Sequence, residues 1–105
     1  MTNDDLVAEM VDRIKSRFEP LRIILFGSRA RGDASAHSDV DLLVVLAKVE
    51  NTRRAAVDIR RALTDLPVGK DIVVTSPDEI ALRGDRVGSV LRPALREGKV
   101  LYERG

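Results

Sequence analysis

The sequence predicts an α/β fold, a small mixed β-sheet flanked by helices. Three short apolar runs rich in branched side chains have the length of strands, at residues 22–26, 42–46 and 71–74. Longer stretches with the apolar periodicity of helices precede and separate these runs. We expect one domain covering residues 1–105, because a chain of this length can bury roughly two-thirds of its unfolded surface and fold alone.

The first helix is expected at residues 4–18, and Pro20 ends it because the residue before a proline avoids the helical conformation. Its apolar residues are spaced four apart and therefore share one face. They are Leu6, Met10, Ile14 and Phe18. The opposite face mixes acidic and basic side chains, which indicates a helix packed on a protein core and not on a membrane.

A second amphipathic helix is expected from about Thr52 to Leu66, between the second and third strands. Its arginines are interleaved with aspartates, so its polar side is either a solvated face or a surface for a partner. The third strand, at residues 71–74, then follows Pro67 and Gly69.

The C-terminal third of the chain predicts two more helices and a short strand. Ser76 is followed by the proline and glutamate typical of a helix start. A later helix is expected at about residues 86–97, where Pro93 should kink or shorten it. Residues 100–102 are expected to form the last strand.

Composition narrows the possible functions. The chain has no cysteine, which excludes disulfides and thiolate metal sites and favours a reducing cytoplasm. No apolar run is long enough to span a bilayer, so no membrane is expected. A net charge of +1 and only three aromatic residues make nucleic acid an unlikely partner.

The candidate site lies between the first two strands. Gly27 allows a sharp turn and the close approach of a ligand, and Ser28 would begin a short helix, at residues 28–31, whose free N–H groups attract phosphate. Asp39 and Asp41 are two residues apart at the start of an extended strand, so their carboxylates point to one face. Without a cation between the two charges, one carboxylate would be protonated or the pair would destabilise the fold, and a divalent metal such as Mg²⁺ is the usual compensation. A phosphate site beside a metal site predicts a nucleoside triphosphate, and two metal ions would suit phosphoryl or nucleotidyl transfer.

Asp71 is the expected third carboxylate. A strand–helix–strand unit of this length makes a crossover, so the strand that begins near Asp71 should run parallel to the one that begins near Asp39 and start at the same edge. The alternative is that Asp71 only caps a strand. A lone Gly-Ser or Asp-x-Asp is also common in solvated loops, and only their combination within this context carries information.

Gly27-Ser28, ten residues and Asp39-x-Asp41 resemble the G-S-x10-D-x-D signature of nucleotidyltransferases related to DNA polymerase β. Residues 26–32, Phe-Gly-Ser-Arg-Ala-Arg-Gly, and 38–42, Ser-Asp-Val-Asp-Leu, are more closely similar to the minimal nucleotidyltransferases. Those small proteins are often paired with a helical toxin of the HEPN class.

This resemblance implies the polymerase β-like fold and the transfer of AMP from ATP, with two Mg²⁺ ions, to a tyrosine of a HEPN-type toxin, which makes the chain an antitoxin. It also implies that Asp71 is the third acidic residue and that Arg31 is the second arginine of the motif, although an ion pair between Arg31 and Asp33 is an alternative. A non-catalytic antitoxin that blocks its partner by occlusion is the competing function. Either the helix at 52–66 or the segment 84–105 could dock the partner.

Overall fold

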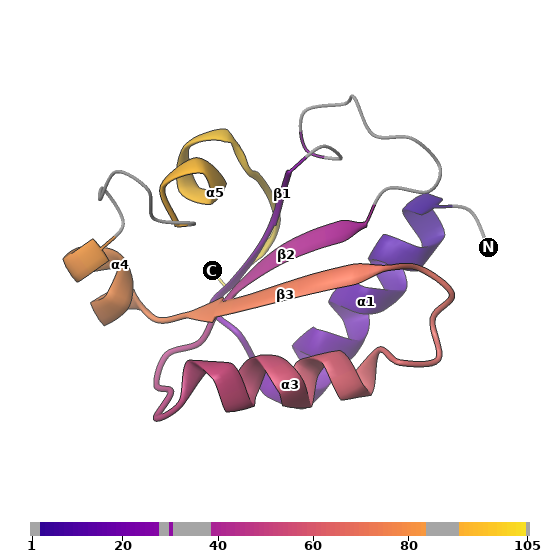
Figure 1. The fold of residues 1–105 in the computed structure, drawn as a ribbon, viewed down its shortest axis with the longest axis horizontal. Coiled ribbons are helices and arrows are strands. Elements are labelled where there is room, and N and C mark those ends of the chain that lie inside the picture. The colour runs from indigo at the N-terminus through magenta and orange to yellow at the C-terminus, as the bar shows by residue number, and fades with distance from the viewer. Residues whose placement is uncertain (1–2, 28–29, 31–38, 84–90, 105) are drawn as a thin grey trace.

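The computed structural model describes residues 3–27, 30, 39–83 and 91–104. These residues form a mixed four-stranded sheet in the order β3-β2-β1-β4, flanked by helices, which confirms the predicted fold class (Figure 1). The strands are β1 (Arg22–Phe26), β2 (Val40–Val45), β3 (Lys70–Thr75) and β4 (Lys99–Glu103). The helices are α1 (Asn3–Phe18), α3 (Thr52–Ala62), α4 (Pro77–Arg83) and α5 (Leu91–Glu97).

Strand pairing fixes which residues meet at the edge of the sheet. β1 runs antiparallel to both β2 and β4, whereas β2 runs parallel to β3, with α3 in the connection between them. The parallel pair places Asp71 directly opposite Asp41. The expected crossover is therefore confirmed, and β3 starts at the same edge as β2.

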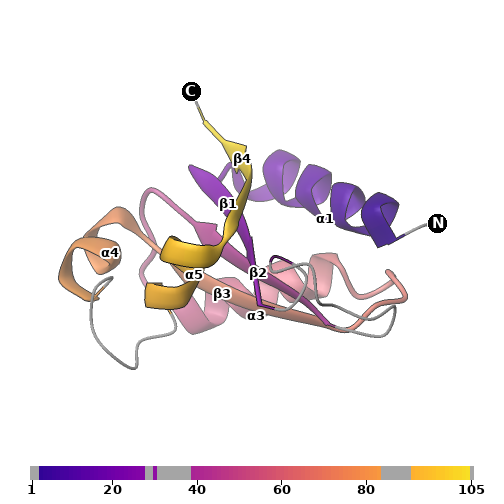
Figure 2. The same cartoon turned by 90° about the horizontal axis from the view of Figure 1, so that it is seen from above.

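The two faces of the sheet carry different cores. The larger core joins α1 and α3 to one face, and its fully buried side chains include Met10, Leu42 and Ile59. The smaller core joins Leu91 and Ala94 of α5 to the other face. Figure 1 shows α1 and α3 below the sheet and α5 above it, and Figure 2, seen from the α5 side, shows that helix over the strands. Alternate residues of β1, β2 and β3 therefore face different helices.

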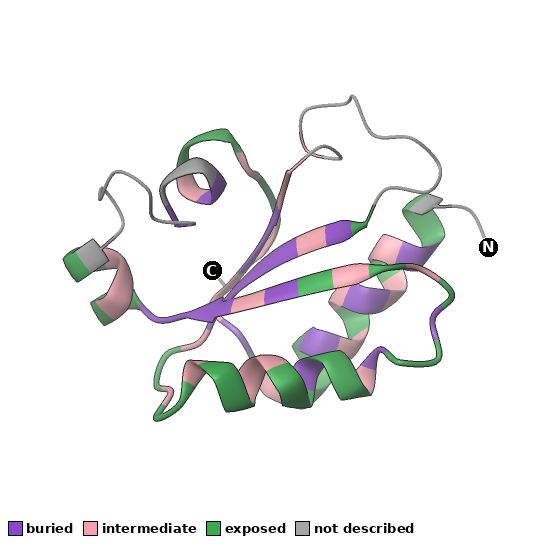
Figure 3. Cartoon of the chain, viewed as in Figure 1, coloured by how far each residue is buried: buried purple, intermediate pink, exposed green. Residues whose placement is uncertain are grey.

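α3 is shorter than expected. It ends at Ala62 and not at Leu66, because the chain then changes to tighter bonds, with Leu63 N–H donating to the Arg60 carbonyl and Leu66 N–H donating to that of Leu63. Leu63 and Leu66 remain buried in the larger core, so the apolar periodicity continues past the last helical residue. Figure 3 shows the exposed outer side of α3.

α5 begins, within the described residues, at Leu91, so Pro93 falls in its first turn. Proline is tolerated there because the N–H groups of the first turn have no partner within the helix. The expected start near residue 86 lies outside the described residues, as does most of the short helix expected at 28–31, of which only Ala30 is described and is helical. In the described part of the chain, no helix is long and apolar enough to cross a membrane.

An ion-pair cluster joins α1 to the end of α3. The Arg13 guanidinium donates to both carboxylate oxygens of Asp65, at 2.5 and 3.1 Å, and to the Ala62 carbonyl at 3.1 Å. Its Nε donates to Glu9, at 3.0 Å. The hydrogen bonds from Arg13 lower the pKa of Asp65 below its usual value. Arg13 therefore satisfies one carbonyl at the end of α3 and connects two helices that cover the same face.

Candidate active site

Asp41, the second residue of β2, stands at the centre of the candidate site. It lies opposite Phe26, the last residue of β1, and opposite Asp71, the second residue of β3. Because side chains alternate along a strand, Asp41 shares the α5 face with Leu43, and Asp71 shares it with Val73. Two carboxylates on neighbouring strands therefore start from one face at one end of the sheet.

Gly27 forms the turn that leaves β1 beside Asp41. Its φ of +74° lies in the left-handed region, which side chains with a Cβ rarely adopt. A Cβ at this position would also collide with Oδ2 of Asp41. The turn and the carboxylate thus lie against each other, and only glycine satisfies both the backbone angle and the contact.

The carboxylate of Asp39 lies against Gly69, the residue that precedes β3, as the carboxylate of Asp41 lies against Gly27. The N–H of Val40 donates to the Gly69 carbonyl at 2.9 Å, which joins the start of β2 to the turn before β3. A Cβ on Gly69 would collide with Oδ1 of Asp39. The sequence did not indicate Gly69 as a residue of the site, because a glycine before a strand has many structural uses and its contact with Asp39 depends on the pairing of β2 and β3.

The donor set fits a hard divalent cation in its chemistry, since Asp39, Asp41 and Asp71 offer carboxylate oxygens at one end of the sheet. The side chains do not form a coordination shell as they lie. Across residues 3–27, 30, 39–83 and 91–104, no three acidic or histidine side chains gather into a group that could hold a metal ion. The strand register fixes only the backbone positions, so convergence on one cation requires rotation of the carboxylates.

Two residues expected to bind the nucleotide, Ser28 and Arg31, lie outside the described residues. The structure does place the ends of the segment that contains them. That segment leaves β1 at Gly27 and rejoins the sheet at Asp39, and both ends contact the same carboxylate region.

The mixed sheet, with a glycine turn beside paired aspartates at one edge, defines a protein of the nucleotidyltransferase class. The comparison with known families agrees. The chain belongs to the nucleotidyltransferase domain family, whose model matches residues 7–92, and the protein is a nucleotidyltransferase.

Known proteins similar to this chain include a relative from Methanocaldococcus jannaschii named "Putative protein adenylyltransferase MJ1305". It is 29% identical over 111 residues, and the match covers 96% of this chain and 72% of that protein. A crystal structure of a mutant of the toxin–antitoxin MntA-HpeT has a TM-score of 0.67 at 22% identity, covering 93% of this chain and 72% of that one. A toxin–antitoxin structure with AMP-PNP has a TM-score of 0.61 at 21% identity, covering 97% and 74%. At these identities the two structures show the shared fold alone.

Proposed function

We propose that the protein transfers AMP from ATP, in the presence of Mg²⁺, to a tyrosine hydroxyl of a HEPN-type toxin and so acts as an antitoxin. The observation that carries this proposal is the placement of Asp39 and Asp41 against two glycine turns, Gly27 and Gly69, at the edge where Asp71 also starts. The relative named as a protein adenylyltransferase supports the AMP group and a protein acceptor. The toxin–antitoxin neighbours, one of them with AMP-PNP, support the partner and the nucleotide.

Each part of the site has a role in this reaction. Ser28 and the N–H groups that follow Gly27 would bind the triphosphate, and Arg31 would add a guanidinium, which suits phosphate oxygens. Asp39, Asp41 and Asp71 would hold Mg²⁺, which neutralises charge on the attacking and leaving oxygens of an in-line displacement. Gly27 lies against Asp41, and a triphosphate bound at that turn would lie beside the carboxylates. The tyrosine oxygen would then form a bond to the α-phosphorus as pyrophosphate leaves.

The test replaces Asp39 or Asp41 with asparagine and measures AMP transfer to the purified candidate toxin by intact-protein mass spectrometry. We expect transfer to fall about a hundredfold or more, since electrostatic stabilisation of the transferred group is lost. Asp58→Asn is the matched control, because it removes one charge from an exposed position of α3. Wild-type rates in either active-site variant would contradict the assignment. A toxin that gains no AMP yet loses its toxicity would show that occlusion, and not catalysis, neutralises it.

A further inference from the structure

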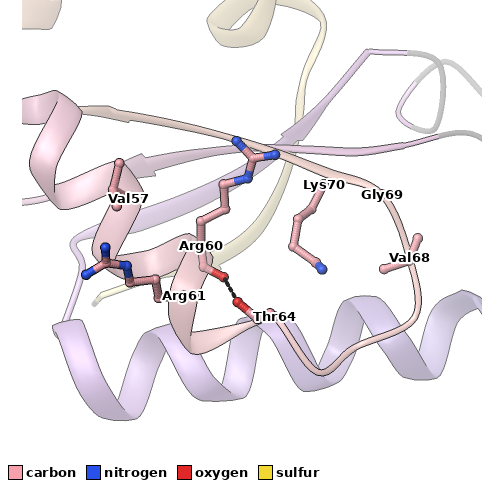
Figure 4. A pocket seen from close by; sticks show the side chains of 7 residues that line it. All are labelled: Val57, Arg60, Arg61, Thr64, Val68, Gly69 and Lys70. Atoms are coloured by element: carbon pink, nitrogen blue, oxygen red, sulfur yellow. Dashed lines mark hydrogen bonds between the residues drawn. The ribbon is translucent and has the colours of Figure 1, made fainter.

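An open pocket of about 420 Å³ lies between α3 and the start of β3, away from the sequence motif (Figure 4). All three charged residues of its lining are basic, with Arg60 and Arg61 contributed by α3 and Lys70 by β3. The complete lining is Val57, Arg60, Arg61, Thr64, Val68, Gly69 and Lys70. Figure 4 shows the Arg60 side chain reaching up towards β3 and that of Lys70 descending from β3 towards the loop.

The two arginines are available to an incoming anion. Among the described residues, neither Arg60 nor Arg61 forms an ion pair. Asp65 is the acidic residue four positions after Arg61, the spacing that favours a pair on a helix, but Arg13 of α1 binds it through both oxygens. The cluster that joins the two helices therefore engages Asp65 and keeps it from pairing with the arginines of the pocket.

The rest of the lining gives the pocket a shape suited to a peptide. Lys70 Nζ donates to the Leu66 carbonyl at 3.1 Å, which holds its ammonium group over the turn that follows α3. Val57 is 48% exposed, and Val68 adds a second apolar side chain. Cations around exposed aliphatic surface match a segment that carries carboxylates along with apolar side chains.

The pocket and the candidate active site meet at Gly69, the residue that precedes the edge strand β3. Gly69 lines the pocket and also lies against the Asp39 carboxylate. Lys70 and Asp71 are consecutive on β3, and the alternation of side chains sends Lys70 to the α3 face and Asp71 to the α5 face. A polypeptide held in the pocket therefore needs to pass only the end of one strand to bring a hydroxyl to the carboxylates.

We infer that this pocket docks an acidic segment of the acceptor protein, an inference that rests on the proposed function. Of the two docking elements expected from the sequence, this inference selects the stretch 52–66, which contains α3, and not the C-terminal segment 84–105. A nucleic acid is a poorer match, because its binders need basic surface that extends along many phosphates. Here the three cations lie in one pocket, and Asp58 and Asp65 are on the same stretch of chain.

The test uses a fluorescent peptide that contains one tyrosine and a run of glutamates, and follows its binding by anisotropy without ATP. The pocket variant combines Arg60→Gln, Arg61→Gln and Lys70→Gln. The matched control combines Arg53→Gln, Arg54→Gln and Lys99→Gln, which removes the same charge from exposed positions outside the pocket. Should the loss of Lys70 unfold the pocket variant, the double variant that retains Lys70 takes its place.

We expect the pocket variant to bind the peptide about tenfold more weakly, since each exposed ion pair contributes up to a few-fold in affinity. The control should bind within about twofold of wild type, because long-range attraction between exposed charges is screened by salt. Equal weakening in both variants would overturn the inference by showing only a general effect of charge. So would an oligothymidylate that binds more tightly than the peptide and loses its affinity in the pocket variant.

Transfer measurements separate this inference from the proposed function. With the same peptide as AMP acceptor, the pocket variant should raise the KM for peptide and leave the KM for ATP unchanged. Asp41→Asn should abolish transfer and retain peptide binding. If the pocket variant transfers AMP with an unchanged KM for peptide, the docking inference fails while the enzyme stands. If wild type binds the peptide through the pocket but transfers AMP to no acceptor, the proposed function fails and the docking site stands.

Discussion

Two glycines and two aspartates form paired contacts at the edge of the sheet. Gly27 leaves room for the carboxylate of Asp41, and Gly69 leaves room for that of Asp39. The two contacts differ in what a substitution would change. At Gly27 a side chain would meet both the carboxylate and a backbone angle of φ +74°, which costs roughly 1–2 kcal/mol for a non-glycine residue. At Gly69 the three nearest atoms all belong to the flexible end of Asp39.

Gly69→Ala should therefore lower activity without unfolding the protein. The added Cβ would displace the carboxylate of Asp39, an exposed residue outside the hydrophobic core. We expect the rate of AMP transfer to fall about tenfold or more, since a small misplacement at a reacting centre is costly. Thermal unfolding measured by circular dichroism should remain within a few degrees of wild type.

Gly98→Ala provides the opposite case. There the Cβ would meet the Ala94 carbonyl and the Ile24 methyl group, neither of which can move away easily because both belong to the core between α5 and β1. This variant should lose stability.

Wild-type transfer by Gly69→Ala would show that the reaction does not depend on the position of Asp39 beside Gly69.

At the scale of elements, the contact between Arg13 and Asp65 connects α1 to the end of α3. We expect Asp65→Asn to lower the melting temperature at neutral pH, because a neutral amide cannot accept the same charge-assisted bonds. The pKa of Asp65 is lowered in the folded protein, so its contribution is complete above the pKa of the unfolded chain, about 3.9. That contribution is lost as the pH falls through the still lower folded pKa.

The difference in melting temperature between wild type and Asp65→Asn should accordingly shrink as the pH falls below about 4. Asp58→Asn is the control, since it changes an exposed aspartate of α3 that lacks this contact. A difference that stays constant from neutral to acidic pH would show that the ion pair is not its cause.

The elements were predictable from sequence where local chemistry decides them. The bounds of β1 were correct, because Pro20 and Gly27 limit an apolar run that has no other place to end. The end of α3 was not, because Leu63 and Leu66 continue the helical spacing into a turn. That turn is held partly by Arg13 on another helix, which no local pattern reveals.

At the scale of the whole molecule, topology rules applied to the sequence correctly predict that Asp71 starts at the same edge of the sheet as Asp41. The contact of Gly69 with Asp39 and the basic pocket of α3 could not be predicted in the same way. The first depends on the register between β2 and β3. The second depends on the hydrogen bonds by which Arg13 of α1 engages Asp65. Both the register and these bonds are products of the complete fold. Sequence thus located the motif, whereas the fold connected it to a surface on the other side of β3.

The placement of three carboxylates at one end of the sheet predicts how ligands affect the stability of the whole molecule. Like charges that start from one face repel each other, so Asp41→Asn should melt at the same temperature as wild type or slightly above it in the absence of Mg²⁺. Ligands that bind only the folded state stabilise it by about 2.7 kcal/mol at a hundred times their Kd. Mg²⁺ with an ATP analogue that carries a methylene bridge between its α and β phosphates, and so cannot transfer AMP, should therefore raise the melting temperature of wild type and leave that of Asp41→Asn almost unchanged. Differential scanning fluorimetry measures both, with Asp58→Asn expected to follow wild type, and an equal rise in Asp41→Asn would place the nucleotide away from this edge of the sheet.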